Sequence, residues 1–174
     1  IKALRAGTNA TDDDLARFQK EARIIAQLRH PGIVDVYEVG ESQGLVYLVL
    51  EYMNGGALAS FLDGTPLDPQ LAAKIVAELA EGAAAAHRVG VVHRDLKPGN
   101  VLVSLDEELL TSGRRRDASL LREPGVALKL ADFGLAKSLG SDDQQTMSGV
   151  MLGTPEYVAP EQMRRGPDAT PRSD

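Results

Sequence analysis

The chain has 174 residues, enough for one ordinary domain with a sizeable core. Hydrophobic residues make up 43% and charged residues 25%, a balance typical of globular proteins and unlike a disordered tail, a collagen repeat or a coiled coil. The formal net charge of −6 argues against a general nucleic-acid binder. The absence of cysteine excludes disulfides and thiol nucleophiles, and the sequence holds no apolar run of about 18 residues that could span a membrane.

Two helices are predicted from capping signals and apolar spacing. Thr11, followed by three aspartates, begins the first helix, whose apolar residues recur at steps of three and four as far as Leu28. This helix ends before Pro31. Asp68-Pro69 begins the second helix, and Gly90 ends it.

Strands are predicted where short apolar runs alternate with turn residues. Runs at 33–39 and 45–50 flank the segment 40–44 and predict a hairpin. Further runs at 91–92, 101–103 and 127–130 predict strands that hold the loops between them. The polar stretch 104–126 is interpreted as an excursion on the surface, and 138–151 as a mobile loop.

The stretch HRDLKPGN, residues 93–100, contains the closest grouping of candidate catalytic side chains in the sequence. It offers a carboxylate at Asp95, an amine at Lys97 and an amide at Asn100. A phosphoryl transfer needs such a set, because a carboxylate accepts the proton of the attacking hydroxyl, a cation offsets phosphoryl charge and oxygen ligands bind a hard metal ion. The alternative is a turn whose residue types serve only its conformation.

Three further features are weak when taken singly. Asp132 ends an apolar run before Phe133-Gly134 and can meet Mg²⁺, although a plain exit from a strand is the commoner case. Lys2 in an apolar strand and Glu21 in the first helix read as surface residues, and Glu21 could pair with Arg17. GTPEYVAPEQ, residues 153–162, reads as a proline-rich loop. A given tripeptide arises by chance in about one chain in fifty of this length, so the ordered set is no accident.

The order of these motifs resembles the eukaryotic-type (Hanks-type) Ser/Thr protein kinase family, and the style of the sequence is similar to its bacterial members. The resemblance implies Asp95 as catalytic base and Lys97 as the catalytic-loop lysine that marks the Ser/Thr class. It implies Asn100 and Asp132 as metal ligands. It also implies nucleotide-binding positions: the phosphate-holding Lys2, its partner Glu21, and the hinge residues Glu51 and Met53, whose backbone meets adenine.

The same resemblance implies an α+β, two-lobed partial kinase fold. Residues 1–52 would form a small antiparallel β lobe with one helix, and 53–174 a larger, mainly helical lobe. The implied function is Mg²⁺-dependent transfer of the ATP γ-phosphoryl group to Ser/Thr hydroxyls of proteins. No nucleic-acid partner is implied, and the domain would be cytoplasmic, with membrane anchoring outside this chain left open.

Several single positions acquire expected roles from the family pattern. Asp174 would anchor the catalytic loop, Thr154 would position the catalytic Asp and Lys, and Ala159-Pro160-Glu161 would end the activation segment. The positions expected to stack as a regulatory spine are Ile25, Val36, His93 and Phe133.

Phosphorylation sites are expected in two places. Arg94 before Asp95 resembles kinases that are switched by phosphorylation of the activation loop, with Thr146 and Ser148 as candidate sites. Ser119, with Arg116 three residues before it, resembles a site for a basic-directed kinase, against the alternative of a charged solvated loop.

The termini predict a fragment. Residues 1–4 read as the second half of a strand, and the glycine-rich phosphate loop and later helices of the family pattern are not present. We therefore expect these 174 residues alone to show little activity. Two other functions stay open: a pseudokinase scaffold, and a small-molecule phosphotransferase, against which GTPEYVAPEQ argues.

Overall fold

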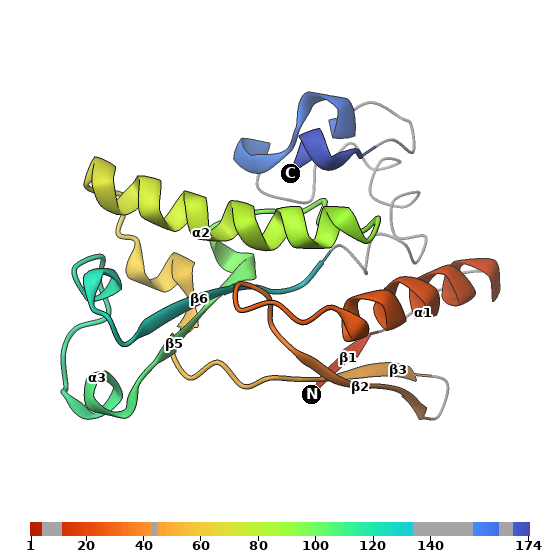
Figure 1. The fold of residues 1–174 in the computed structure, drawn as a ribbon, viewed down its shortest axis with the longest axis horizontal. Coiled ribbons are helices and arrows are strands. Elements are labelled where there is room, and N and C mark those ends of the chain that lie inside the picture. Colours follow the sequence, from red (N-terminus) through yellow and green to blue (C-terminus); the bar gives the residue numbers. More distant parts are fainter. Residues whose placement is uncertain (5–11, 43–44, 134–154, 164–168) are drawn as a thin grey trace.

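The computed structural model describes residues 1–4, 12–42, 45–133, 155–163 and 169–174. Two three-stranded antiparallel sheets form its framework, one near each end of the view in Figure 1. The first sheet has the order β1-β3-β2, and the second the order β4-β5-β6. None of the helices in these ranges combines the length and the apolar character that a membrane crossing requires.

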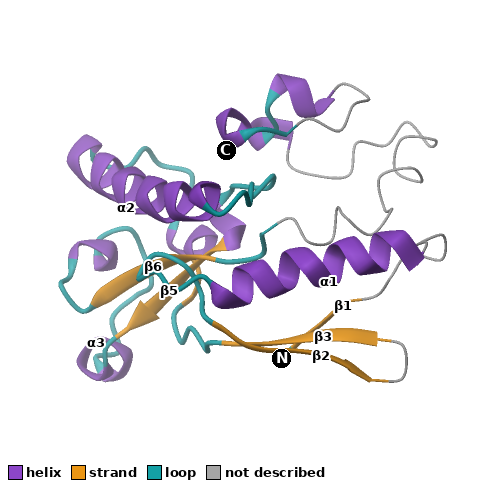
Figure 2. Ribbon diagram, turned by 45° about the vertical axis from the view of Figure 1, so that its right-hand side comes forward, coloured by secondary structure: helices purple, strands orange, loops and turns teal. Residues whose placement is uncertain are grey.

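The first sheet is built from β1 (Lys2–Leu4), β2 (Val36–Ser42) and β3 (Leu45–Leu50). Helix α1 (Asp12–Gln27) lies along one face of it, as Figure 2 shows. The register pairs Lys2 with Leu48, so β1 lies at the edge of the sheet, beside the middle of β3. This register fixes the position of the Lys2 backbone, and therefore the point from which its side chain extends.

The apolar run 33–39 is divided between the two sheets, whereas the sequence predicts one strand. Ile33 forms an isolated parallel bridge with Leu130, and the Val34 N–H donates to the Leu130 carbonyl at 2.9 Å. The part from Val36 onward pairs with β3 instead. Hydrophobic content cannot reveal such a division, because both halves are equally apolar. The hairpin also differs from expectation, since Gly40, Glu41 and Ser42 belong to β2 and not to a turn.

Helix α2 (Pro69–Arg88) begins and ends as its sequence predicts. The Asp68 side chain caps it by accepting from the N–H groups of Gln70 and Leu71. At its end Gly90 adopts φ +80°, and the Val91 N–H donates to the Ala86 carbonyl in a Schellman arrangement. Val91 is therefore held as a helix cap and belongs to no strand, contrary to the expectation for 91–92.

The second sheet consists of β4 (Gly56–Ala57), β5 (Val101–Leu105) and β6 (Val126–Leu130). It places residue 100 and residue 131 side by side, because β5 and β6 pair from Val101–Leu130 onward and the Ala131 N–H donates to the Asn100 carbonyl at 2.9 Å. Two residues of the predicted site, Asn100 and Asp132, therefore lie at the same end of the sheet.

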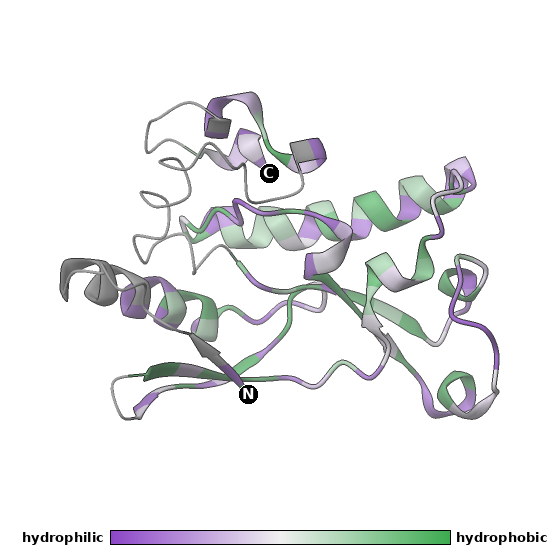
Figure 3. Ribbon diagram, turned by 180° about the vertical axis from the view of Figure 1, so that it is seen from behind, coloured by the Kyte–Doolittle hydropathy of each residue, from purple (hydrophilic) through white to green (hydrophobic). Residues whose placement is uncertain are grey.

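The connection from 104 to 126 is more than a surface excursion. It contains α3 (Glu107–Thr111), and Figure 3 shows hydrophilic and hydrophobic stretches alternating along it. Leu120 and Leu121 are 1% and 4% exposed and join the main core. Arg116 donates to the Gly55 carbonyl at 3.2 Å, which ties the connection to the start of β4. The polar composition of the stretch conceals these two buried leucines.

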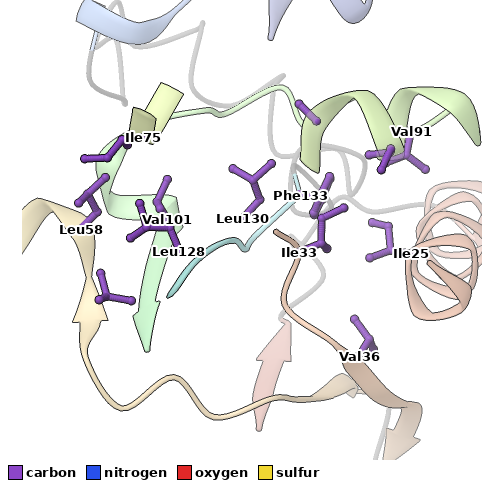
Figure 4. Close-up of a cluster of buried hydrophobic side chains, with 14 of the residues drawn as sticks. Ile25, Ile33, Val36, Leu58, Ile75, Val91, Val101, Leu128, Leu130 and Phe133 are labelled. Atoms are coloured by element: carbon purple, nitrogen blue, oxygen red, sulfur yellow. The ribbon is translucent and has the colours of Figure 1, made fainter. Parts of the chain in front are cut away.

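One hydrophobic core extends across both sheets and both long helices. Figure 4 shows Ile25, Ile33 and Phe133 close to one another, with Leu130 between them and the group around Val101. Gly82 of α2 faces the chain at residue 32, where a Cβ would lie 2.9 Å from the Gly32 carbonyl oxygen. Because the core is shared, the division into lobes at residues 52 and 53 stays a prediction.

Candidate active site

Lys2 and Asp132 form an ion pair across the molecule. The Lys2 Nζ lies 2.6 Å from Asp132 Oδ1, and both side chains are about two-fifths exposed, at 39% and 40%. Lys2 reaches this position from β1, and Asp132 follows the end of β6. Asp132 has φ +61°, a left-handed conformation that a residue other than glycine rarely adopts. An ammonium and a carboxylate that stand 130 positions apart in the chain therefore meet at a solvent-accessible point.

Asp95 is the centre of a second group of polar side chains. Its Oδ2 lies 2.8 Å from Lys97 Nζ and accepts a hydrogen bond of 2.7 Å from the Asn100 side-chain amide. The same amide nitrogen donates to the Asp95 carbonyl at 2.8 Å. Since the nitrogen of the Asn100 amide is directed at Asp95, its oxygen is turned the other way. The carboxylate keeps 30% exposure, so a substrate group can approach it.

The backbone before Asp95 is anchored by Asp174, as expected. Asp174 is 1% exposed at its side chain, and it accepts from the N–H groups of His93 and Arg94 at 2.7 Å each. A third donor, His87 Nε2, lies 2.8 Å from Asp174 Oδ2. Arg94 itself has φ +68°, so the loop holds a strained residue directly before Asp95.

His93 is completely buried and neutral. Its Nε2–H donates to the Ala131 carbonyl at 2.9 Å, which leaves Nδ1 to accept from the Asp95 N–H at 3.3 Å. Burial lowers the pKa of His93 below the ordinary value of 6.5, against the opposing effect of the bond to Ala131. The ring lies 4.7 Å from that of Phe133, centroid to centroid. The four positions of the expected spine, Ile25, Val36, His93 and Phe133, are all buried, and their stacking stays a prediction.

The predicted hinge positions direct their side chains into the protein. Glu51 accepts from Lys129 Nζ at 2.8 Å with each carboxylate oxygen, and from the Asp35 N–H at 3.1 Å. Met53 is 7% exposed and packs with Val34 and Ala131. The proposed contact with adenine therefore falls to the backbone of these residues and stays a prediction.

Other predicted positions are placed less completely. Glu21 lies half-buried on α1, and its pairing with Lys2 stays a prediction. Thr146, Ser148 and Thr154 lie outside the described residues, as does the loop expected at 138–151. Ser119 is exposed, and its hydroxyl donates to Asp117 Oδ1 at 2.6 Å. Nothing in that arrangement decides between a modification site and a solvated loop.

The sequence did not predict a role for three side chains near the site: His87, Lys129 and Gln162. Their partners Asp174, Glu51 and Arg94 lie 87, 78 and 68 positions away, so local spacing could not connect them. Gln162 belongs to the segment GTPEYVAPEQ, which the sequence analysis identified as a motif, but no role was predicted for this residue. The Gln162 side chain donates to the Arg94 carbonyl at 2.9 Å.

The donor set suits a magnesium–nucleotide complex. Asn100 and Asp132 supply an amide oxygen and a carboxylate, which are oxygen ligands of the kind that Mg²⁺ prefers. Lys2 supplies a cation for phosphate beside them. Within the described ranges the residues form no cluster of three His, Cys, Asp or Glu side chains of the kind that holds a metal alone. A metal here would therefore share its coordination with phosphate and water.

The group of Asp95, Lys97 and Asn100 and the Lys2–Asp132 pair supply the kinds of side chain that a phosphoryl-transfer centre needs. The family model described as protein kinase domain matches residues 1–174. The chain belongs to the protein kinase domain family.

Named relatives and a solved structure agree with this assignment. The chain is 38% identical over its full length to the probable serine/threonine-protein kinase PknB of Lactococcus lactis, and 38% identical to PknL of Mycobacterium tuberculosis. It spans 25% and 39% of the lengths of these relatives. The crystal structure of the Mycobacterium tuberculosis PknI kinase domain superposes with a TM-score of 0.65 at 27% identity, over 99% of this chain and 56% of that one. The partial two-lobed kinase fold and the resemblance to bacterial Ser/Thr kinases are thereby confirmed.

Proposed function

We propose that the protein carrying this chain is a Ser/Thr protein kinase that transfers the γ-phosphoryl group of ATP to hydroxyls of protein substrates. The contact of 2.6 Å between Lys2 and Asp132 carries the proposal, because it joins the phosphate-binding and metal-binding positions of the family pattern. The proposal includes a cytoplasmic location for the domain and no nucleic-acid partner. Kinase relatives named for the Ser/Thr class, at 38% identity, support it.

Asp95 acts on the substrate hydroxyl in this proposal. Its carboxylate orients the hydroxyl and accepts the proton as the oxygen attacks phosphorus. Lys97, at 2.8 Å, supplies a cation beside the transferring group, and Asn100 prevents rotation of the carboxylate. Positioning and electrostatic stabilisation account for most of the catalysis, since the loose transition state needs little covalent help.

Mg²⁺ and ATP complete the site. Asn100 and Asp132 would hold the metal, which would offset the charge of the phosphate oxygens. Lys2 would hold the α- and β-phosphates, with Glu21 as its partner on α1. The backbone of residues 51–53 would bind adenine. The described part of the chain contributes these positions from both sheets, so nucleotide binding requires the two sheets to keep their relative arrangement.

The test is transfer of phosphate from γ-labelled ATP to Ser-, Thr- and Tyr-containing peptides by the full-length protein. Asp95→Asn keeps the size of the side chain and removes the base, so the rate should fall by roughly 10²–10⁴-fold. Asp63→Asn, at an exposed turn far along the chain from the site, is the matched control and should keep the wild-type rate. Turnover like that of wild type in Asp95→Asn would remove Asp95 from the mechanism, and phosphorylation of an aminoglycoside in place of peptide would favour a small-molecule phosphotransferase.

A further inference from the structure

Gln162 connects the expected end of the activation segment to the catalytic loop, which are two separate motifs of the kinase pattern. It lies in the short turn η6 (Pro160–Met163), at the expected end of the activation segment. Its Nε2 donates to the Arg94 carbonyl at 2.9 Å, while its Oε1 accepts from the Ala159 N–H at 3.2 Å. Both ends of the amide are therefore used, one on its own turn and one on the catalytic loop.

The carbonyl that Gln162 binds belongs to a strained residue. Arg94 has φ +68°, and a residue other than glycine keeps such a conformation only where its surroundings hold it. Two hydrogen bonds among the described residues contribute to this, one on each side of the residue. The Arg94 N–H donates to Asp174 Oδ1 at 2.7 Å, and the Arg94 carbonyl accepts from Gln162. The strained backbone is thus fixed at both of its hydrogen-bonding groups.

The peptide between Arg94 and Asp95 sets the direction of the catalytic carboxylate. Its nitrogen side is held by His93 Nδ1 at 3.3 Å, a long bond, and its carbonyl side by Gln162 at 2.9 Å. If the carbonyl loses the Gln162 donor, rotation of this peptide becomes easier and the Asp95 side chain turns with it. Among the described residues, the side chains of His93, Asn100 and Asp174 also bond to the backbone from His93 to Asp95. Unlike Gln162, none of these three residues belongs to 155–163.

We propose that Gln162 is a positioning residue that couples the placement of residues 155–163 to the orientation of Asp95. The neighbouring Glu161 accepts from the Ser173 hydroxyl at 2.6 Å, next to the anchor Asp174. The turn 160–163 thus contacts the catalytic loop and the segment that anchors it. The inference rests on the proposed kinase function for its effect on rate, but the structural coupling can be measured without activity.

The experiment compares Gln162→Met and Gln162→Glu with the wild-type full-length protein. Methionine keeps the length of the side chain without a donor, and glutamate keeps an acceptor for Ala159 but offers none of the donors that Arg94 needs. Both variants should lower kcat by roughly 5- to 100-fold, the range expected when a partly buried carbonyl loses its partner. The KM for ATP should stay within about two-fold of the wild-type value, because the Lys2–Asp132 pair is untouched. Gln70→Glu, an exposed position at the start of α2, is the control.

Hydrogen exchange at the amides of residues 93–95 provides the second measurement. In both Gln162 variants these amides should exchange faster than in wild type, while amides in the centre of α2 should keep their rates. Unchanged kcat together with unchanged exchange at 93–95 would overturn the proposal, and so would faster exchange throughout the protein, which would indicate general destabilisation. If the wild-type protein transfers no phosphate, the proposed function fails, and exchange at 93–95 still tests the coupling.

Discussion

His93 links the catalytic loop to the residues before Asp132 through one neutral imidazole. Its two nitrogens bond to the Ala131 carbonyl and the Asp95 N–H, and its ring contacts Phe133. Protonation at Nδ1 would remove the acceptor for Asp95. The loop geometry therefore depends on the ring staying uncharged.

The stability of the protein should fall as the pH is lowered below about 6.5. Burial lowers the pKa of His93 in the folded state. Between the two pKa values, the unfolded chain therefore binds a proton at His93 that the folded chain does not bind. The contribution of this residue to the free energy of unfolding should decline by up to roughly 1.4 kcal/mol per pH unit, from the unfolded pKa of about 6.5 down to the folded one. Chemical denaturation at several pH values measures it. In His93→Phe the pH dependence should be shallower by this amount, and an unchanged slope would contradict the assignment.

The Lys2–Asp132 pair should matter for activity and little for stability. At 39% and 40% exposure the pair is screened by water, so Lys2→Met should change the free energy of unfolding by less than about 1 kcal/mol. Phosphoryl transfer should fall by at least roughly 100-fold, because the phosphates lose their cation. Thermal unfolding and labelled-ATP assays of the same preparation separate the two effects. Lys74→Met, an exposed position on α2, is the matched control. A large loss of stability without loss of transfer would show the pair to be structural.

At the level of elements, the connection between β5 and β6 is the least expected part of the molecule. Its polar residues face solvent, but Leu120 and Leu121 are buried in the core. Arg122 Nη2 lies 3.1 Å from Asp68, the residue that caps α2, and Arg116 binds the carbonyls of Asn54 and Gly55. The connection therefore contacts the start of α2 and the chain that leaves the hinge.

Leu120→Ala should lower the free energy of unfolding by roughly 2–5 kcal/mol, because it leaves a cavity in the shared core. Leu110→Ala, in α3 at 44% exposure, should have a far smaller effect. Urea denaturation compares the two variants with wild type. Equal, small effects would show that the connection is the surface excursion that its composition suggests.

The elements that the sequence predicted correctly are those with local signals. Asp68-Pro69 and Gly90 mark both ends of α2, since caps and stop residues act within a few positions. The division of the 33–39 run could not be predicted, because the partner of Ile33 is Leu130. At the site, motifs identified Asp95, Asn100 and Asp132, whereas Gln162 and Lys129 act on partners far along the chain.

On the scale of the whole molecule, three kinds of contact in the described part of the chain join the two sheets. The bridge from Ile33 to Leu130 joins their backbones, the core extends beneath both, and ion pairs connect their ends. Among the described residues two such pairs occur, Lys2–Asp132 and Glu51–Lys129, and the side chains of the second pair are less exposed, at 23% and 16%. These contacts keep Lys2 within reach of Asp132.

A double-mutant cycle on Glu51→Gln and Lys129→Met tests this connection. Each single substitution should lower the free energy of unfolding by roughly 1–3 kcal/mol, since it leaves a partly buried charge without its partner. The double variant should be no less stable than the worse single variant, which corresponds to a coupling energy of about 1–3 kcal/mol. Denaturation of the four proteins gives this energy. Additive losses would show that the two side chains act independently.

The convergence of Lys2, Asn100 and Asp132 on one magnesium–nucleotide site is tested most directly by calorimetric titration of the full-length protein with ATP, with and without Mg²⁺. The wild-type protein should bind ATP at least about ten-fold more tightly with Mg²⁺, and Asp132→Asn should lose most of that difference because a charged ligand is gone. The matched variant Asp117→Asn, in the connection between β5 and β6, should keep it. Equal dependence on Mg²⁺ in wild type and Asp132→Asn, or no binding of ATP by the wild-type protein, would contradict the account.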